Sequence, residues 1–152
     1  TNDQITLGAV STYANEEYVN GNSTGRILSY RANRDVTVRT KDVQLVSKLS
    51  QSIGDLLQTG VPVNNYGPQY YISTLSELRP KLLGEAMKDA RVRADSITKA
   101  VGGSVGAVIN VKIGPFQVTT QDSTQAADYG AYDTSTITKT VTSTVSVTFK
   151  TK

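Results

Sequence analysis

The side chains that could do chemistry in this chain are carboxylates, lysines, tyrosines and hydroxyls, because its 152 residues include no Cys and no His. This composition excludes a thiol nucleophile, a disulfide, an imidazole base and an ordinary zinc, copper or haem site. A hydrolase with a carboxylate pair would have to use residues such as Glu77 and Glu85. Both stand among bases on a solvated helical segment, where ordinary acidity is expected. We therefore predict no enzyme, no catalytic residue and no cofactor.

Two groups of side chains are candidates for an interaction surface, and each also has a structural explanation. Tyr66, Tyr70 and Tyr71 could stack on a base or a sugar, although tyrosines in a strand usually lay their rings on the sheet and keep their hydroxyls in water. Arg31 and Arg39 lie on one face of a predicted strand and could bind phosphates. Charge on an exposed sheet face gives the same pattern, and it is the simpler interpretation.

Three acids in a long loop, Asp122, Asp128 and Asp133, could bind calcium through their oxygens. They lack the close alternation of a known calcium-binding loop. We interpret them as solvated loop acids, and we predict no metal site.

The charge is unevenly distributed. Residues 26–112 hold 13 of the 16 bases and only seven acids, whereas residues 1–25 and 113–138 carry acids alone. A basic middle section could attract phosphate or an anionic surface, but alternating charge on a solvated helix gives the same count. No apolar run approaches the roughly 20 residues that span a bilayer, so we predict no transmembrane segment.

Five segments show the alternation of apolar and polar residues that is typical of strands: 27–40, 105–113 and 137–149 strongly, and 4–12 and 63–73 more weakly. In residues 137–149 most odd positions are apolar, and the even ones are all Thr or Ser. In residues 27–40 only Arg34 interrupts the apolar face. A bulge, or an edge position from which the charge reaches water, would explain this interruption.

A first helix is predicted over 43–57. Its apolar residues recur every three or four positions: Val46, Leu49, Ile53 and Leu56. Asp42 or Thr40 can cap its start, and Gly60 can end it in a left-handed conformation.

A second helix is predicted over 82–101. Its apolar stripe consists of Leu83, Met87, Ala90, Ala94, Ile97 and Val101. Thr74 and Glu77 match a capping box, but Pro80 would end or distort a helix that begins there, unless the cap lies nearer Ser76 or Arg79. The Gly pair at 102 and 103 ends the helix.

These elements, in the order ββαβαββ, predict an α+β fold. Two helices with one apolar stripe each need a sheet to cover, so we expect a two-layer sandwich with both helices on one face of a mainly antiparallel sheet. The loops at 13–25 and 114–134 are long, and each could form an extended hairpin arm.

Two sequence motifs carry a family resemblance. Residues 29–42 read SYRANRDVTVRTKD, residues 85–95 read EAMKDARVRAD, and Ala100, Gly102 and the strand VSVTF follow in order. The set is similar to the ordered motifs of SIMPL-domain proteins. Ser29 stands where the family usually has Gly. We therefore interpret residues 1–152 as a single SIMPL-like domain.

The resemblance implies an exported bacterial protein, periplasmic or associated with the cell envelope, whose biochemistry is poorly defined and which is in some cases linked to stress protection. It implies no catalytic set. The usual strand and helix at the start of the domain are not found here, so we expect an N-terminally truncated domain without its signal peptide. An incomplete domain exposes apolar surface, which favours self-association.

Two functions from different classes follow. The first is a non-enzymatic protein that acts by association with a protein partner or with its own copies, without nucleic acid. The alternative is a binding module for an anionic ligand or nucleic acid that uses the basic residues of 26–112. Light scattering tests the first, and salt-dependent retention on heparin or DNA tests the second.

Overall fold

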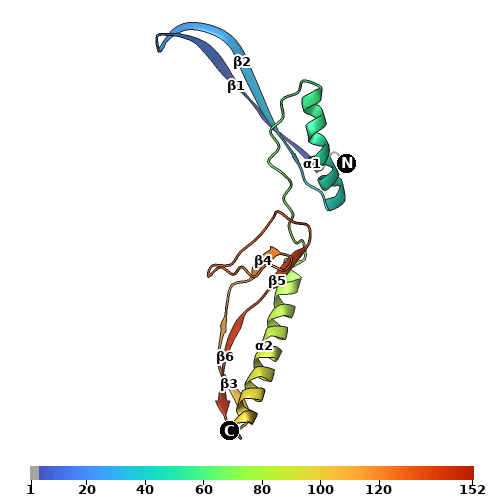
Figure 1. Ribbon diagram of the computed structural model, residues 1–152, viewed down its shortest axis with the longest axis vertical. Coiled ribbons are helices and arrows are strands. Elements are labelled where there is room, and N and C mark those ends of the chain that lie inside the picture. The colour runs from blue at the N-terminus through green and yellow to red at the C-terminus, as the bar shows by residue number, and fades with distance from the viewer. Residues whose placement is uncertain (1–3) are drawn as a thin grey trace. The chain divides into compact units, whose positions relative to one another are not determined.

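The computed structural model describes residues 4–152, which form two helices and antiparallel strands (Figure 1). The α+β class is therefore confirmed. In chain order the elements are β1 (Ile5–Val19), β2 (Asn22–Val38), α1 (Val43–Gln58), α2 (Leu75–Ala100), β3 (Val105–Ile113), β4 (Gln117–Thr120), β5 (Lys139–Thr142) and β6 (Val145–Thr151). The chain divides into two units, Thr1–Tyr66 and Gly67–Lys152. The prediction of one domain over 1–152 stays a prediction.

The first unit contains one long hairpin, which we call the arm, made of β1 and β2. Asn20 and Gly21 connect the two strands, and both have positive φ, 51° and 82°. This Asn-Gly pair is the preferred chemistry for a two-residue hairpin turn, whose twist matches that of the strands. The predicted hairpin arm at 13–25 is therefore confirmed, and its strands are longer than the sequence pattern indicated.

The pairing of β1 with β2 places the apolar side chains on one face of the arm. Paired residues share a face, and successive residues alternate between faces. The apolar face of the arm consists of Ile5, Leu7, Val10, Thr12, Ala14 and Glu16 from β1 and Ile27, Tyr30, Ala32, Arg34, Val36 and Val38 from β2. The alternation predicted for 27–40 is confirmed from Tyr30 to Val38, where β2 ends, but a register shift between Asn15 and Glu16 pairs Ile27 instead of Leu28 with Glu16.

The bulge predicted from Arg34 is present in the facing strand. The register shifts between Leu7 and Val10, so β1 contains one extra residue there. The Nε atom of Arg34 donates a hydrogen bond of 3.1 Å to the carbonyl oxygen of Gly8 inside this bulge. The arginine thus satisfies a backbone acceptor that the irregular ladder releases.

Helix α1 begins and ends as its sequence predicts. The side chain of Asp42 accepts a 2.9 Å hydrogen bond from the backbone N–H of Leu45, which makes it the N-cap. Gly60 follows the helix with φ 81°. The returning chain fastens to the helix where the Asn65 amide donates to the Ser50 carbonyl oxygen at 3.3 Å.

In the second unit, α2 packs along β6 and β3 (Figure 1). The helix begins at Leu75 and continues through Pro80. The predicted capping box is wrong, because Thr74 makes no side-chain cap. Instead the carbonyl oxygen of Thr74 accepts from the N–H groups of Glu77 and Leu78. Pro80, the sixth residue of the helix, removes one intrahelical hydrogen bond, and the helix continues past it.

The predicted stripe of α2 is correct at its centre and wrong at its end. Leu83, Met87 and Ala94 are half-buried, whereas Ile97 is 69% exposed and Val101 81% exposed. A straight helix has 3.6 residues per turn, so the covered face moves to Thr98 at this end, where the hydroxyl bonds back to the Ala94 carbonyl oxygen.

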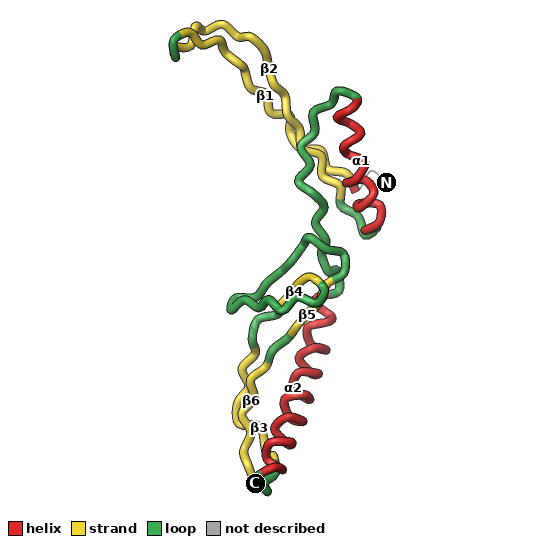
Figure 2. The backbone as a smooth tube through the Cα atoms, viewed as in Figure 1, coloured by secondary structure: helices red, strands yellow, loops and turns green. Residues whose placement is uncertain are grey.

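The predicted strand at 63–73, between the helices, is wrong, and so is the order ββαβαββ. Residues 61–72 are extended and in no sheet (Figure 2). Pro62 and Pro68 have no N–H for a ladder, and Gly67 has φ 76°. The segment still makes single contacts, since the Tyr70 N–H donates to the Thr134 carbonyl oxygen at 2.8 Å.

The predicted last strand is extended but divides into β5 and β6. β5 pairs with β4, and β6 pairs with β3. The break coincides with Gly114 and Pro115 in the facing chain, where the Gly114 N–H donates to Thr144 and Pro115 has no donor.

Within residues 4–152 the strands form three two-stranded sheets, not the predicted single sheet. Helix α2 on β3 and β6 is a small helix-on-sheet layer. The expected sandwich, with both helices on one face, stays a prediction.

Candidate functional site

The two units differ in how much of their side chains they bury. Of residues 4–66, none is buried. The buried side chains of the described residues, including Tyr70, Val105 and Val118, all belong to the second unit. The side chains of the first unit are therefore exposed or half-buried, and the buried side chains of the described residues lie in the second unit.

The exposed apolar surface of the first unit has two parts. The apolar face of the arm carries side chains such as Leu7 and Val10, which are 54% and 57% exposed. On α1, half of the predicted stripe is open, since Leu49 and Leu56 are exposed while Val46 and Ile53 are half-buried. Contiguous apolar patches of this kind mark interaction sites more often than isolated exposed residues do.

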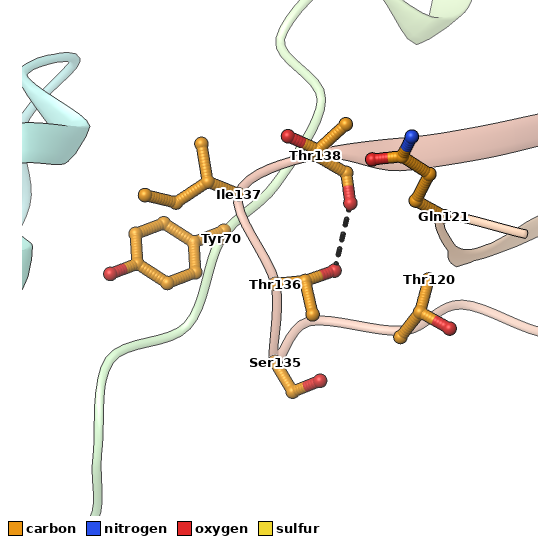
Figure 3. A pocket seen from close by; sticks show the side chains of 7 residues that line it. All are labelled: Tyr70, Thr120, Gln121, Ser135, Thr136, Ile137 and Thr138. Atoms are coloured by element: carbon orange, nitrogen blue, oxygen red, sulfur yellow. Dashed lines mark hydrogen bonds between the residues drawn. The ribbon is translucent and has the colours of Figure 1, made fainter.

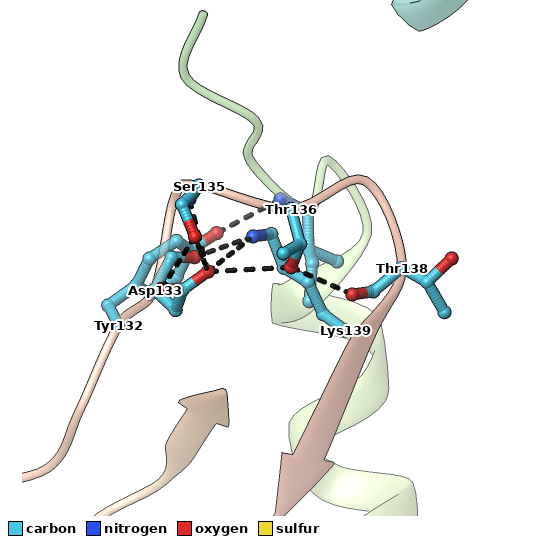
Figure 4. A network of polar contacts seen from close by, with 7 residues as sticks. Tyr132, Asp133, Ser135, Thr136, Thr138 and Lys139 are labelled. Carbon is cyan, nitrogen blue, oxygen red and sulfur yellow. Dashed lines mark hydrogen bonds and ion pairs between the residues drawn. The ribbon is translucent and has the colours of Figure 1, made fainter. Parts of the chain in front are cut away.

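A cluster of polar side chains in the second unit is connected by hydrogen bonds and an ion pair (Figure 4). The Nζ atom of Lys139 donates to the carbonyl oxygen of Asp133 at 2.7 Å and lies 3.5 Å from its Oδ1 atom. The same Oδ1 accepts from the backbone N–H of Ser135 at 3.0 Å and from its hydroxyl at 3.1 Å. The Lys139 side chain is only 3% exposed. The cluster ties the loop 121–138 to the start of β5.

The surroundings of Asp133 lower the pKa of its carboxyl group. Burial acts to raise this pKa, but the hydrogen bonds from Ser135 and the charge of Lys139 outweigh that effect and hold it below its usual value of 3.8. A carboxylate with a lowered pKa is a weak proton acceptor at neutral pH. The pair of Ser135 with Asp133 is therefore suited to fastening a loop, not to activating a nucleophile.

This lowered pKa predicts acid sensitivity of the second unit. Asp133 binds a proton less readily in the folded than in the unfolded chain, so its contribution is complete above about pH 5 and is lost as the pH falls through the folded pKa. We expect thermal unfolding between about pH 5 and pH 2 to be less pH-dependent in Asp133→Asn than in the natural chain. Asp128→Asn, which changes an exposed acid of the same loop, is the control. Equal slopes in all three proteins would contradict the prediction.

An open hollow of about 480 Å³ lies beside the cluster (Figure 3). Most of its lining residues carry a hydroxyl or an amide group beside their apolar atoms: Tyr70, Thr120, Gln121, Ser135, Thr136 and Thr138, with Ile137. Thr136 donates to the carbonyl oxygen of Thr138 at 2.9 Å, so one of these hydroxyls is already engaged. Tyr70 is 8% exposed, and little of its ring is open to a ligand. The hollow offers polar contacts without a base or an aromatic platform.

The three tyrosines of the predicted interaction surface have different surroundings. Tyr66 is 89% exposed, and Tyr70 is buried. The hydroxyl of Tyr71 donates to Gln69 at 2.6 Å, and its ring lies 6.0 Å from that of Tyr132. Tyr71 and Tyr132 form a small aromatic pair, and the interaction surface of the three tyrosines stays a prediction.

Arg31 lies on the polar face of the arm, opposite the apolar face, and Arg39 directly follows the end of β2. Both are exposed, and Arg31 pairs with Tyr13 in the neighbouring strand. Eight residues of strand separate them by roughly 26 Å, too far for two side chains to grip one phosphate group. As interaction residues they stay a prediction.

Among residues 4–152, no group of three or more acids could hold a metal ion. Asp133, one of the three candidate calcium ligands, instead pairs with Lys139. No helix in the described part is long and apolar enough to cross a membrane.

The sequence interpretation missed Lys139 as a buried charge. A signal was available, because Lys139 occupies an odd position in the alternating run 137–149, where its neighbours on that face are apolar. A charged residue on an apolar face either lies at the edge of the sheet or forms an ion pair. The partner of Lys139 could not be identified without the conformation of the loop that carries Asp133.

The sequence comparisons agree with the motifs. The model of the family described as "SIMPL: Protein of unknown function (DUF541)" matches residues 1–149. Since the match extends over almost the whole chain, the chain belongs to the SIMPL family. No curated protein and no solved structure matches the chain significantly.

Proposed function

We propose that this member of the SIMPL family is a non-enzymatic, exported protein of the bacterial periplasm or envelope that acts through protein–protein association, beginning with its own assembly into a homo-oligomer. The observation that carries the proposal is the absence of any buried residue in 4–66, although this unit presents apolar side chains on both the arm and α1. The envelope location rests on the family resemblance.

The exposed area supports a large contact surface. The chain exposes 11975 Å², whereas a compact monomer of its mass, 16.3 kDa, exposes about 7,500 Å². Two separate compact domains that shared this mass would expose about 9,000 Å². The surplus over two such domains is about 3,000 Å², comparable with the area that permanent protein complexes bury.

The architecture of the arm supports the same proposal. A single two-stranded hairpin is marginally stable in water unless further strands or a helix cover it. Both long edges of the arm also leave rows of backbone groups without a ladder partner, which favours addition of another chain. Since β1 and β2 pair only with each other among the described residues, a partner protein supplies the cover.

Sedimentation of the purified full chain tests this function. We expect a defined oligomer at micromolar concentration, with a sedimentation coefficient that falls on dilution. A strict monomer over the whole concentration range, with no protein partner recovered from an envelope extract, would refute the proposal. A direct redox role in stress protection has little support, because one Met and no Cys offer no reversible thiol chemistry.

The alternative is an anionic ligand or nucleic acid bound by the basic residues of 26–112. Part of this charge is already paired, since Arg26 lies 3.4 Å from Glu17 and Arg93 lies 2.8 Å from Asp89. Retention on heparin that persists above physiological salt would favour the alternative. Elution at low salt would leave association as the function.

A further inference from the structure

The apolar face of the arm carries two charged side chains, one of each sign. Glu16 pairs with Ile27 in the half of the arm near the turn. Arg34 pairs with Val10 in the half near the base. Both side chains are exposed, and neither forms an ion pair within the described residues. The other residues of this face are apolar or small and carry no charge, so Glu16 and Arg34 are the two charged residues of the face.

The two charges are placed symmetrically about the centre of the arm. Arg34 lies at the level of position 10 of β1, and Glu16 lies at position 16. Their midpoint is Tyr13, one residue from Thr12, the middle of β1. If a second arm lies antiparallel on the first with the two-fold axis at the level of Tyr13, one residue from full overlap, position 16 of each copy faces position 10 of the other. Each Glu16 then meets an Arg34.

We propose that two copies of this chain dock the apolar faces of their arms against each other in antiparallel orientation, with two symmetric Glu16–Arg34 ion pairs that set the register. The proposal rests on the proposed function and names the partner and the surface that association uses. A two-fold axis near Tyr13 makes the interface self-complementary, as closed dimers require. The opposite charges disfavour a parallel arrangement, in which Glu16 would face Glu16 and Arg34 would face Arg34.

The area of the face is sufficient for such a dimer. Fifteen residues of β1 extend over roughly 50 Å at about 3.4 Å per residue, and two strands are about 10 Å wide. Full overlap thus covers roughly 500 Å² on each copy, or about 1,000 Å² together, which reaches the lower limit of specific interfaces. The polar face of the arm, with Ser11, Asn33 and Arg31, stays in water.

Charge reversal in the full chain tests the register. We expect Glu16→Arg and Arg34→Glu each to weaken self-association by about tenfold, because every dimer then has two like-charge contacts. An equimolar mixture of the two variants restores association, since each of the two contacts then joins an arginine of one copy to a glutamate of the other. Arg31→Glu is the matched control: it makes the same charge change three positions away on the polar face, and we expect no effect.

A pair of cysteine variants provides a measurement that does not depend on charge. The natural chain has no Cys, so Ala32→Cys places the only thiol on the apolar face near the two-fold axis. A short thiol-to-thiol crosslinker should join two copies of this variant. Asn33→Cys, one residue away on the polar face, should remain uncrosslinked under the same conditions.

The outcomes separate this inference from the proposed function. An oligomer that forms normally in both charge variants, with equal crosslinking in the two cysteine variants or with none in either, would overturn the arm-to-arm interface while leaving association intact. A natural chain that is monomeric and binds no protein would overturn both. Loss of association in each charge variant, recovery in the mixture and crosslinking of Ala32→Cys alone would establish the interface.

Discussion

Val118→Asp is expected to abolish the cooperative unfolding transition of residues 67–152. Val118 is 1% exposed and is the most deeply buried side chain of the described residues. Its backbone N–H donates to the Ala131 carbonyl oxygen at 2.8 Å, and its carbonyl oxygen accepts from the Asp133 N–H at 2.8 Å. The chain is thus held on both sides of this residue, and a new charge cannot reach water by a small shift.

The size of the effect follows from burial. An unpaired carboxylate in an apolar position costs several kcal/mol even after relaxation, while a whole domain is stable by about 5 to 15 kcal/mol. We expect Val118→Ala to give a smaller loss of about 1 to 3 kcal/mol from the cavity. Chemical denaturation followed by circular dichroism measures both variants. A Val118→Asp protein with a natural transition would show that β4 is not the centre of this unit.

The two units show which parts of the structure the sequence pattern could predict. A period of two assigns residues to faces, and the predicted faces were correct from Tyr30 to Val38, including the bulge indicated by Arg34. The pattern does not say what covers a face. Val36 and Val145 both stand in alternating runs, yet Val36 is 60% exposed, whereas Val145, in β6, is half-buried.

Local rules failed where long-range contacts or backbone chemistry intervened. The tyrosines of 63–73 favour a strand, but Pro62 and Pro68 have no N–H donor for a ladder, and Gly67 has a positive φ that interrupts an extended strand. Lys139 interrupts the apolar face of its strand, which the sequence pattern shows. The carboxylate that pairs with it belongs to Asp133 in a loop, and the conformation of a loop cannot be predicted from an alternating pattern. The sequence could thus indicate which residues are exposed, but it could not indicate which of them lie close together in the fold.

Val10→Asp is expected to weaken self-association by about 100-fold or more while leaving the unfolding of residues 67–152 unchanged. Val10 is 57% exposed on the apolar face of the arm, so an aspartate there remains hydrated in the isolated chain and changes stability by less than about 0.5 kcal/mol. In the arm-to-arm dimer the same residue approaches Ile27 and Glu16 of the other copy. Each dimer then buries two carboxylates, each beside a like charge.

Val10→Asp and Val118→Asp are the same chemical change at an exposed and a buried position, so their contrast isolates the role of each unit. Ser11→Asp adds a charge one residue away on the polar face of the arm, and we expect it to associate normally. Sedimentation measures association, and circular dichroism on heating measures folding. Equal sedimentation of the Val10→Asp and Ser11→Asp variants would show that this face is not buried between copies. Loss of folding in Val10→Asp would instead show that residues within the chain cover it. The prediction requires that the Val10→Asp variant folds normally and loses association, and that the Ser11→Asp variant changes in neither respect.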